Sequence, residues 1–297
     1  MPAISANVKP GMHAMNSNAK GRLLSFGHGY SARALAASLP GWEVIGTHRD
    51  APLRWPGTDM RPYLDGADHL LISIAPGAAA PDDPSGGDPV LAELGDEIAA
   101  RAGRYRWVGY LSTTGVYGDR GGDWVDETSA LRPSTERGRR RVAAEAAWRA
   151  IPGLPLHIFR LAGIYGPGRG PFAKVRAGTA RRIIKPGQVF SRIHVQDIAA
   201  SLAASIARPD PGAIYNLCDD DPAPPEAVIA AAATLLRQPV PPAEDFATAD
   251  MTPMARSFYA ENKRVSNRRI KEDLGVVLKF PTYRDGLADL VRREDVG

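Results

Sequence analysis

The chain has 297 residues, enough for one large domain or for one domain with a smaller lobe, and we expect the second arrangement. A net charge of +4 and an aromatic content of 7% are too modest for a nucleic-acid binder, so we expect anionic small molecules as partners. The single cysteine, Cys218, excludes an intrachain disulfide and a cysteine metal cluster, and no apolar run approaches the roughly 18 residues of a membrane span. We therefore expect a cytoplasmic protein with no metal, nucleic-acid or membrane partner.

Residues 1–21 contain Pro, Gly, Asn and Ser without periodicity, which predicts a flexible extension; translation beginning at Met12 or Met15 stays open. From residue 22 onward, short apolar runs alternate with stretches of helical composition. The expected strands are 23–26, 43–47, 68–75, 107–111, 154–161 and 213–217, and the expected helices are 31–39, 91–102 and 134–150. This alternation predicts an α/β fold, a Rossmann-type doubly wound parallel sheet with a smaller C-terminal substrate lobe.

The regular alternation of strands and helices stops after the strand that ends near Gly163. Residues 166–187 are rich in glycine, proline and basic side chains, which indicates an excursion from the sheet that contributes to a substrate pocket. Residues 189–206 are expected to return to the sheet. We therefore assign 22–165 and 187–217 to a dinucleotide-binding domain, and 166–186 and 218–297 to a substrate-binding lobe.

A glycine turn, Gly27-x-Gly29-x-x-Ala32, connects the first strand to the first helix. In dinucleotide-binding folds the first glycine allows the tight turn, the second lets the backbone approach a pyrophosphate, and a small third residue lets helix and strand pack closely. His28, Tyr30 and Ser31 share this turn and belong to the expected contacts. The turn alone is a weak signal, but a second predicted strand follows it at the expected distance.

The end of that second strand predicts which cofactor is bound. Thr47 and Arg49 are the expected contacts, and Arg49 lies 22 residues after Gly27, where these folds read the adenosine ribose. No carboxylate ends the strand and a guanidinium is near, so we predict NADP over NAD. NAD stays possible, because a small shift in register would place Asp50 on the ribose.

Ordered motifs beyond the glycine turn resemble the extended short-chain dehydrogenase/reductase superfamily, the NAD-dependent epimerase/dehydratase relatives. They are LSTTGVYGD (111–119), a Pro-Ser helix start at 133 leading to Glu145, FRLAGIYGPG (159–168), IHVQDIA (193–199) and YNLCDDDP (215–222). The resemblance implies that Thr113 hydrogen-bonds the substrate oxygen at the reacting carbon. It also implies cofactor contacts at Ser73, Ala75, Leu111, Ser112, Gly163 and Ile164.

The chain departs from this family at the YxxxK pair that normally supplies the proton. Arg137 and Arg141 occupy those two positions, which identifies an atypical branch. A guanidinium stays protonated and binds anions instead of donating a proton, and we expect Glu145 to neutralise one of the two arginines. A substitute donor would be Tyr117, Tyr165, His194 or water. We count Thr113, Arg137, Arg141 and Tyr165 as the catalytic candidates.

A second departure concerns the substrate. Phe190 stands where sugar-nucleotide relatives carry an arginine that clamps the diphosphate, with Arg192 two places on. This lowers the expectation of a sugar nucleotide. Another anionic substrate stays open because residues 166–182 are basic, although we expect most of those side chains to face solvent: Arg169, Lys174, Arg176, Arg181 and Arg182.

Two functions compete on this sequence. The leading one is an NADP-dependent oxidoreductase or epimerase-like enzyme, a monomer or homodimer, that acts on a small polar, anionic carbonyl or hydroxyl substrate with non-standard acid–base residues. The alternative is an NADP(H)-binding regulatory or sensor protein with little or no turnover. Oxidation of NADPH against a panel of carbonyl compounds would separate the two.

Overall fold

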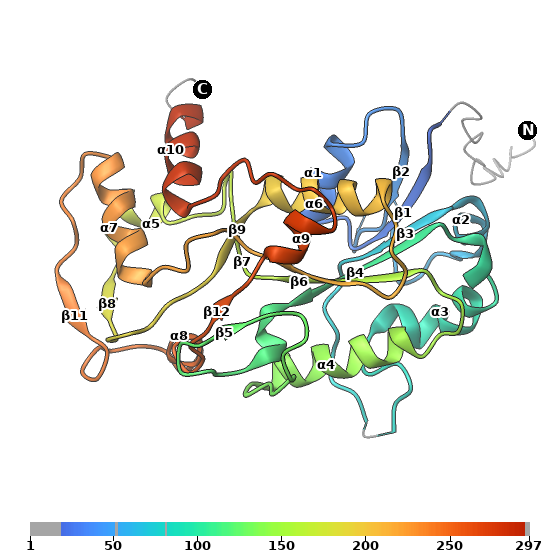
Figure 1. Cartoon of the computed structure of the whole chain (residues 1–297), viewed down its shortest axis with the longest axis horizontal. Coiled ribbons are helices and arrows are strands. Elements are labelled where there is room, and N and C mark those ends of the chain that lie inside the picture. The colour runs from blue at the N-terminus through green and yellow to red at the C-terminus, as the bar shows by residue number, and fades with distance from the viewer. Residues whose placement is uncertain (1–18, 51–52, 81, 295–297) are drawn as a thin grey trace, which may run out of the picture.

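The computed structural model of the chain describes residues 19–50, 53–80 and 82–294. At its centre is a six-stranded sheet in which every neighbouring pair is parallel (Figure 1). Its order is β2 (Glu43–Gly46), β1 (Arg22–Phe26), β3 (His69–Ile72), β4 (Trp107–Thr113), β6 (Leu156–Leu161) and β10 (Ile214–Leu217). The strand order reverses between β1 and β3, and ligands of such sheets bind beyond the carboxyl ends of the strands at that point.

Helices cover both faces of the sheet, which confirms the predicted fold class (Figure 1). One face carries α1 (Tyr30–Ala37), α6 (Val195–Ala207) and α9 (Arg268–Glu272), whose apolar residues share a core cluster with the strands. The other face carries α2 (Arg61–Gly66), α3 (Pro89–Ala99) and α4 (Glu136–Arg149), which build a second cluster. Burial on both faces explains why the strands are almost continuously apolar.

Local signals in the sequence set where the helices begin. The Asp88 side chain caps α3 by accepting hydrogen bonds from the N–H groups of Val90 (2.9 Å) and Leu91 (3.2 Å). Thr135 caps α4 by accepting from Gly138 N–H at 3.1 Å. Two short 3₁₀ turns flank β4 in the sequence: η1 (Ala102–Arg104) precedes it and η2 (Thr114–Tyr117) follows it.

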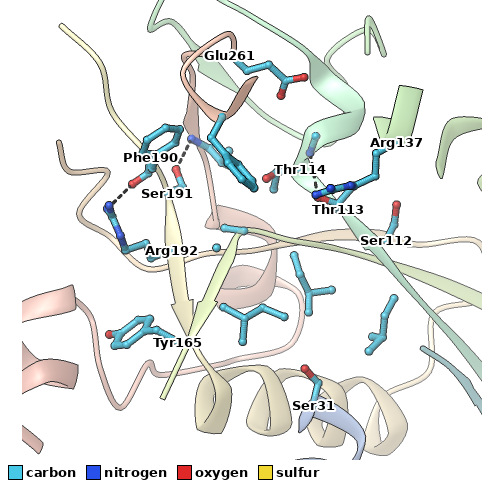
Figure 2. Close-up of a pocket in the computed structure, with 18 of the residues that line it drawn as sticks. Ser31, Ser112, Thr113, Thr114, Arg137, Tyr165, Phe190, Ser191, Arg192 and Glu261 are labelled. Atoms are coloured by element: carbon cyan, nitrogen blue, oxygen red, sulfur yellow. Dashed lines mark hydrogen bonds between the residues drawn. The ribbon is translucent and has the colours of Figure 1, made fainter. Parts of the chain in front are cut away.

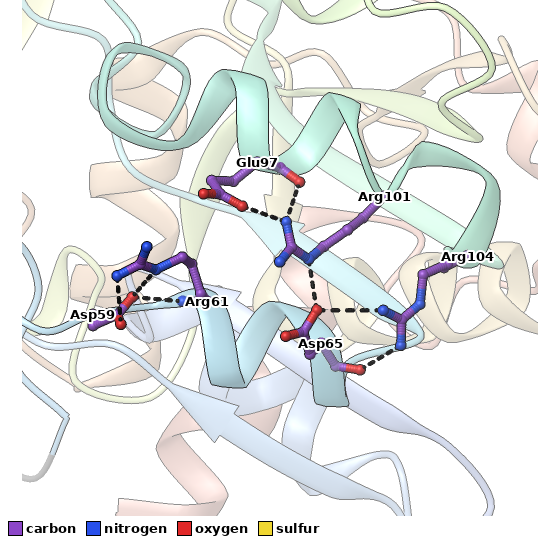
Figure 3. Close-up of polar contacts among 6 residues, drawn as sticks. All are labelled: Asp59, Arg61, Asp65, Glu97, Arg101 and Arg104. Atoms are coloured by element: carbon purple, nitrogen blue, oxygen red, sulfur yellow. Dashed lines mark hydrogen bonds and ion pairs between the residues drawn. The ribbon is translucent and has the colours of Figure 1, made fainter.

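Ion pairs join α2, α3 and η1 on the outer surface (Figure 3). Arg101 pairs with Asp65 at 2.8 Å and with Glu97 at 2.5 Å, while Arg104 reaches Asp65 at 3.3 Å. Because water screens exposed pairs of this kind, they contribute little to stability and act mainly by fixing the relative orientation of these segments.

A smaller lobe lies beside the carboxyl ends of the strands (Figure 1). It consists of α5 (Phe172–Arg176), β8 (Arg182–Ile184), α7 (Pro225–Leu235), β11 (Ala243–Asp245), α8 (Pro253–Phe258) and α10 (Tyr283–Glu294), with β8 and β11 paired in parallel. A third core cluster, which includes Phe172, Val228 and Leu287, holds the lobe together. None of the helices in the described part of the chain is long and apolar enough to cross a membrane.

Two short parallel pairs lie between the lobe and the main sheet. Residues 189–206 return to the sheet through α6, which packs on its face, and not as a strand of it. β9 (Arg192–His194) does not join the six-stranded sheet; it pairs with β7 (Gly163–Tyr165), and α6 follows directly. The main sheet already has β10 beside β6, so β6 has no free edge for β9. The second pair joins β5 (Trp124–Val125) to β12 (Arg264–Val265).

The chain also returns to the main sheet within the predicted lobe segment 218–297. Val265, Ile270 and Leu274 are buried in the core cluster that α1 and α6 share with the sheet. Apolar side chains in this stretch complete one face of the Rossmann half, so the lobe is not continuous in sequence.

Candidate active site

A cavity of about 1070 Å³ runs along the carboxyl ends of the strands, with the sheet on one side and the lobe on the other (Figure 2). Most of the residues that the sequence predicts for the site line it: Gly27, Gly29, Tyr30, Ser31, Ser73, Leu111, Ser112, Thr113, Arg137, Arg141, Gly163, Ile164 and Tyr165. Five others do not line it: His28, Ala32, Thr47, Arg49 and Ala75.

The glycine turn after β1 is fixed from two sides. Gly27 has a φ of +78°, which favours glycine, and a Cβ there would lie 2.7 Å from Ile74 Cγ1. The Gly27 N–H donates to Thr47 Oγ1 at 2.9 Å, and Ser73 Oγ donates to Phe26 O at 3.2 Å. Thr47 and Ser73 therefore hold the turn through hydrogen bonds to its backbone.

The turn leaves an open space where α1 begins. A Cβ built on Gly29 would meet only Gly27 O, at 3.7 Å, and Gly29 caps α1 without a side-chain hydrogen bond. The N–H groups of a first helical turn have no partner within the helix, and they attract anions. An open cradle of backbone donors fits the pyrophosphate of a dinucleotide.

The predicted cofactor residues outside the cavity lining have other surroundings. His28 lies against Gly46 and 5.6 Å from the His48 ring, and burial lowers its pKa. Ala32 is buried in the core, where it allows the helix to approach the sheet. Arg49 and Ala75 are exposed just past the ends of β2 and β3. Their cofactor roles stay predictions.

Two hydroxyl groups at the end of β4 point in different directions. Ser112 Oγ is buried and donates to Glu145 Oε1 at 2.5 Å, so its hydroxyl hydrogen is already used within the protein. Thr113 Oγ1 faces the cavity and accepts from Gly115 N–H at 3.2 Å, which leaves its hydroxyl hydrogen available (Figure 2). Thr113 is therefore placed to donate a hydrogen bond to a ligand oxygen.

The two arginines of α4 both line the cavity, but they differ in their partners. Arg141 Nη1 donates to Leu111 O at 2.7 Å and to Tyr110 Oη at 3.0 Å. Arg137 lies exposed at the cavity mouth and extends toward Thr113 (Figure 2). Within the part of the chain that the structure describes, its guanidinium has no hydrogen bond or ion pair, so it is available to an anion.

The prediction that Glu145 neutralises one of these arginines is wrong. Glu145 pairs instead with Arg160 of β6, at 2.7 Å between Oε2 and Nη2, and both side chains are buried. A buried guanidinium needs a carboxylate far more than one that reaches water. Arg160 therefore takes the carboxylate, and Arg141 turns to backbone and phenol oxygens.

The three side chains considered as substitute proton donors occupy different surroundings. Tyr117 is buried away from the cavity lining, where its hydroxyl donates to Asn216 at 2.7 Å, and burial raises its pKa to about 12. His194, also outside the lining, caps α6 by accepting from Gln196 N–H at 3.2 Å, and burial lowers its pKa to about 4. Tyr165 lines the cavity, with a pKa raised by burial.

The lobe contributes charged residues that the sequence did not single out. Lys263 Nζ donates to Glu261 Oε2 at 2.6 Å and to Gly118 O at 2.9 Å, and both side chains line the cavity. Glu261 also accepts from Ser134 Oγ at 2.5 Å. The contacts of Lys263 with Gly118 and of Glu261 with Ser134 each join residues more than a hundred positions apart, so no local pattern could reveal them.

Arg192 is a further cation on the cavity wall. Its Nη1 donates to Phe190 O at 2.9 Å and to Ala223 O at 3.1 Å. Burial lowers its pKa, although Asp219 nearby opposes that shift. Arg192 therefore supports the segment around Phe190 through backbone contacts.

Comparison with known proteins finds relatives of this chain. No family model matches it. Protein YeeZ of Escherichia coli strain K12 is 33% identical over 201 residues, which cover 62% of this chain and 72% of YeeZ. The solved structure of a functionally unknown conserved protein from Silicibacter pomeroyi is 62% identical, with a TM-score of 0.85, and covers 93% of this chain and 99% of that one.

More distant structures share the fold and were solved with nicotinamide cofactors. The human epimerase family protein SDR39U1, in complex with NADPH, is 18% identical with a TM-score of 0.73, over 91% of this chain and 99% of that one. MoeE5, in complex with UDP-glucose and NAD, is 20% identical with a TM-score of 0.72, over 93% of this chain and 100% of that one. The fold is thus that of epimerase and dehydratase proteins.

Proposed function

Since the chain belongs to the same family as protein YeeZ of Escherichia coli, we propose that it is an NADP-dependent oxidoreductase or epimerase-like enzyme, acting on the carbonyl or hydroxyl group of a small anionic substrate. One observation carries this proposal. A single cavity joins the open cradle above Gly29 to the hydroxyl of Thr113 and the unpaired guanidinium of Arg137. In the same proposal the enzyme is a cytoplasmic monomer or homodimer.

The residues at the glycine turn fit the cofactor. The backbone of Gly29, Tyr30 and Ser31 would hold the pyrophosphate, and Arg49 would reach the 2′-phosphate past the end of β2. Arg169 lies across the cavity with its guanidinium 5.8 Å from the Tyr30 ring, close enough to add a positive charge at the phosphates. The bound cofactor would supply or accept the hydride.

The residues at the other end of the cavity would bind and orient the substrate. The Thr113 hydroxyl would donate to the oxygen on the reacting carbon, while Gly115 N–H holds it in place. Arg137 would bind the anionic group, and as a guanidinium it cannot act as the acid. The proton would then come from water or from Tyr165, the one of the three candidate side chains that lines the cavity, whose hydroxyl otherwise donates to Thr282 O at 3.5 Å.

The deciding experiment follows NADPH oxidation against a panel of small carbonyl compounds. We expect turnover that disappears in Thr113→Ala and persists in Thr113→Ser, which keeps the hydroxyl. Tight NADPH binding without turnover on any compound would favour a regulatory protein instead. Failure to bind NADPH or NADH would contradict both.

A further inference from the structure

The lobe wall of the cavity carries an apolar patch beside its charged residues. The side chains of this patch are Val189, Phe190, Val228, Phe258 and Leu287. Phe258 stays 54% exposed, and of the large hydrophobic side chains that are exposed in the described part of the chain it is the one that lines the cavity. Removing an aromatic ring from water is favourable, so this wall gains from contact with an apolar ligand.

Phe190 is held rigidly on this wall. Its N–H donates to Ala223 O at 3.0 Å, and its own carbonyl accepts from Ala223 N–H at 3.2 Å. The ring stands edge-on to Tyr259 at 5.9 Å, and Tyr259 packs against Phe246 at 5.1 Å. A fixed aromatic surface loses little conformational freedom when a ligand covers it.

The charges around this wall are already paired. Lys263 is bound to Glu261 and to Gly118 O, and Arg192 to two backbone carbonyls. Arg169 belongs to the cofactor end, beside Tyr30. Of the cations that line the described cavity, this leaves Arg137 as the one available at the substrate end.

Resting on the proposed function, we infer that the substrate is a monocarboxylate with an apolar, aromatic or branched aliphatic body. Its carboxylate pairs with Arg137, its carbonyl or hydroxyl group lies at Thr113, and its body packs against Phe190 and Phe258. A sugar nucleotide would place two phosphates and a polar sugar against the apolar patch, beside cations that already donate hydrogen bonds within the protein, and burying unpaired polar groups is unfavourable.

The test measures the affinity of the full-length protein for a matched set of unreactive probes, with and without saturating NADP⁺. The probes are 3-phenylpropionate, propionate, 3-phenylpropionamide and UDP-glucose. We expect 3-phenylpropionate to bind at least about tenfold more tightly than each of the other three, because it alone satisfies both the guanidinium and the apolar wall.

Two variants separate the two contacts. Phe258→Ala should remove most of the advantage of 3-phenylpropionate over propionate while leaving propionate unchanged. Arg137→Gln should remove its advantage over 3-phenylpropionamide. Trp124→Ala is the matched control, because Trp124 is an aromatic side chain that is 60% exposed outside the cavity, and it should change nothing.

The outcomes distinguish this inference from the proposed function. Tighter binding of UDP-glucose than of 3-phenylpropionate, or an unchanged preference in Phe258→Ala, overturns the inferred substrate class even if NADP⁺ binds. Absence of NADP⁺ binding overturns the proposed function, and the probe series without cofactor still decides whether this cavity selects apolar carboxylates.

Discussion

The two walls of the cavity are built differently. The sheet wall presents groups with unused hydrogen-bonding capacity, namely the backbone above Gly29, the Thr113 hydroxyl and the Arg137 guanidinium. The lobe wall presents apolar side chains and cations that the protein itself already pairs, such as Lys263 and Arg192. Under the proposed function, the sheet wall would supply cofactor binding and chemistry, and the lobe wall would supply the selection of substrate.

The largest expected effect comes from removing the buried ion pair that supports the sheet wall. Glu145→Ala leaves the buried guanidinium of Arg160 without its carboxylate and leaves Ser112 without its acceptor. We expect the free energy of unfolding to fall by about 3 to 5 kcal/mol, measured by urea denaturation.

Glu136→Ala is the control for this prediction. Glu136 lies on the same helix and pairs only with exposed arginines, Arg139 and Arg140, so its loss should have little effect. Equal stability of the two variants would show that the buried pair does not support the sheet wall.

The Glu145–Arg160 pair is also an example of what the sequence alone could not predict. Apolar runs that alternate with helical stretches were enough to predict the sheet, because its strands other than the edge strand β2 are mostly buried. The motif around Thr113 placed that residue at the cavity. Arg137, Arg141 and Arg160 could each have paired with Glu145. The pair forms with Arg160 because that guanidinium is buried, which the sequence alone does not show. The apolar and charged lobe wall depends on contacts such as Lys263 with Gly118, which bring together residues that are 145 positions apart.

A second prediction concerns the junction of the two walls, where His194 packs between Tyr165 and Phe280. Burial lowers its pKa to about 4, so the folded protein favours the neutral ring. The stability this provides is present above pH 6.5 and is lost as the pH falls toward 4. We expect unfolding free energies between pH 7 and 4 to fall by about 2 to 3 kcal/mol more in the wild type than in His194→Asn.

Asparagine suits this comparison because it keeps a side-chain acceptor for the Gln196 N–H and does not titrate. Charged neighbours of His194 include Asp289, Arg293 and Lys279, and all three are unchanged in the variant. Parallel stability curves for the two proteins would mean that His194 does not couple this junction to pH.

A third prediction tests the cofactor end of the sheet wall. If Arg49 reads the 2′-phosphate, the wild type should bind NADP⁺ more tightly than NAD⁺ by roughly ten- to a hundredfold, and Arg49→Ala should remove the preference by weakening NADP⁺ alone. Titration of both cofactors into both proteins measures this. Asp50→Ala is the neighbouring control, and equal affinity of the wild type for the two cofactors would count against NADP.

The last prediction concerns the unpaired cation of the sheet wall. Arg137→Ala should weaken carboxylate ligands by about 1.5 kcal/mol and leave cofactor affinity nearly unchanged, as calorimetric titration can measure. Arg140→Ala is the control, because Arg140 pairs with Glu136 and does not itself line the cavity, and it should change neither affinity. Restoring the usual pair, as Arg137→Tyr with Arg141→Lys, should not raise turnover, because Arg141 also supports Leu111 O from the helix. A gain in turnover would mean that the site is a decayed ordinary dehydrogenase site, and that Arg137 and Arg141 do not serve to bind an anion.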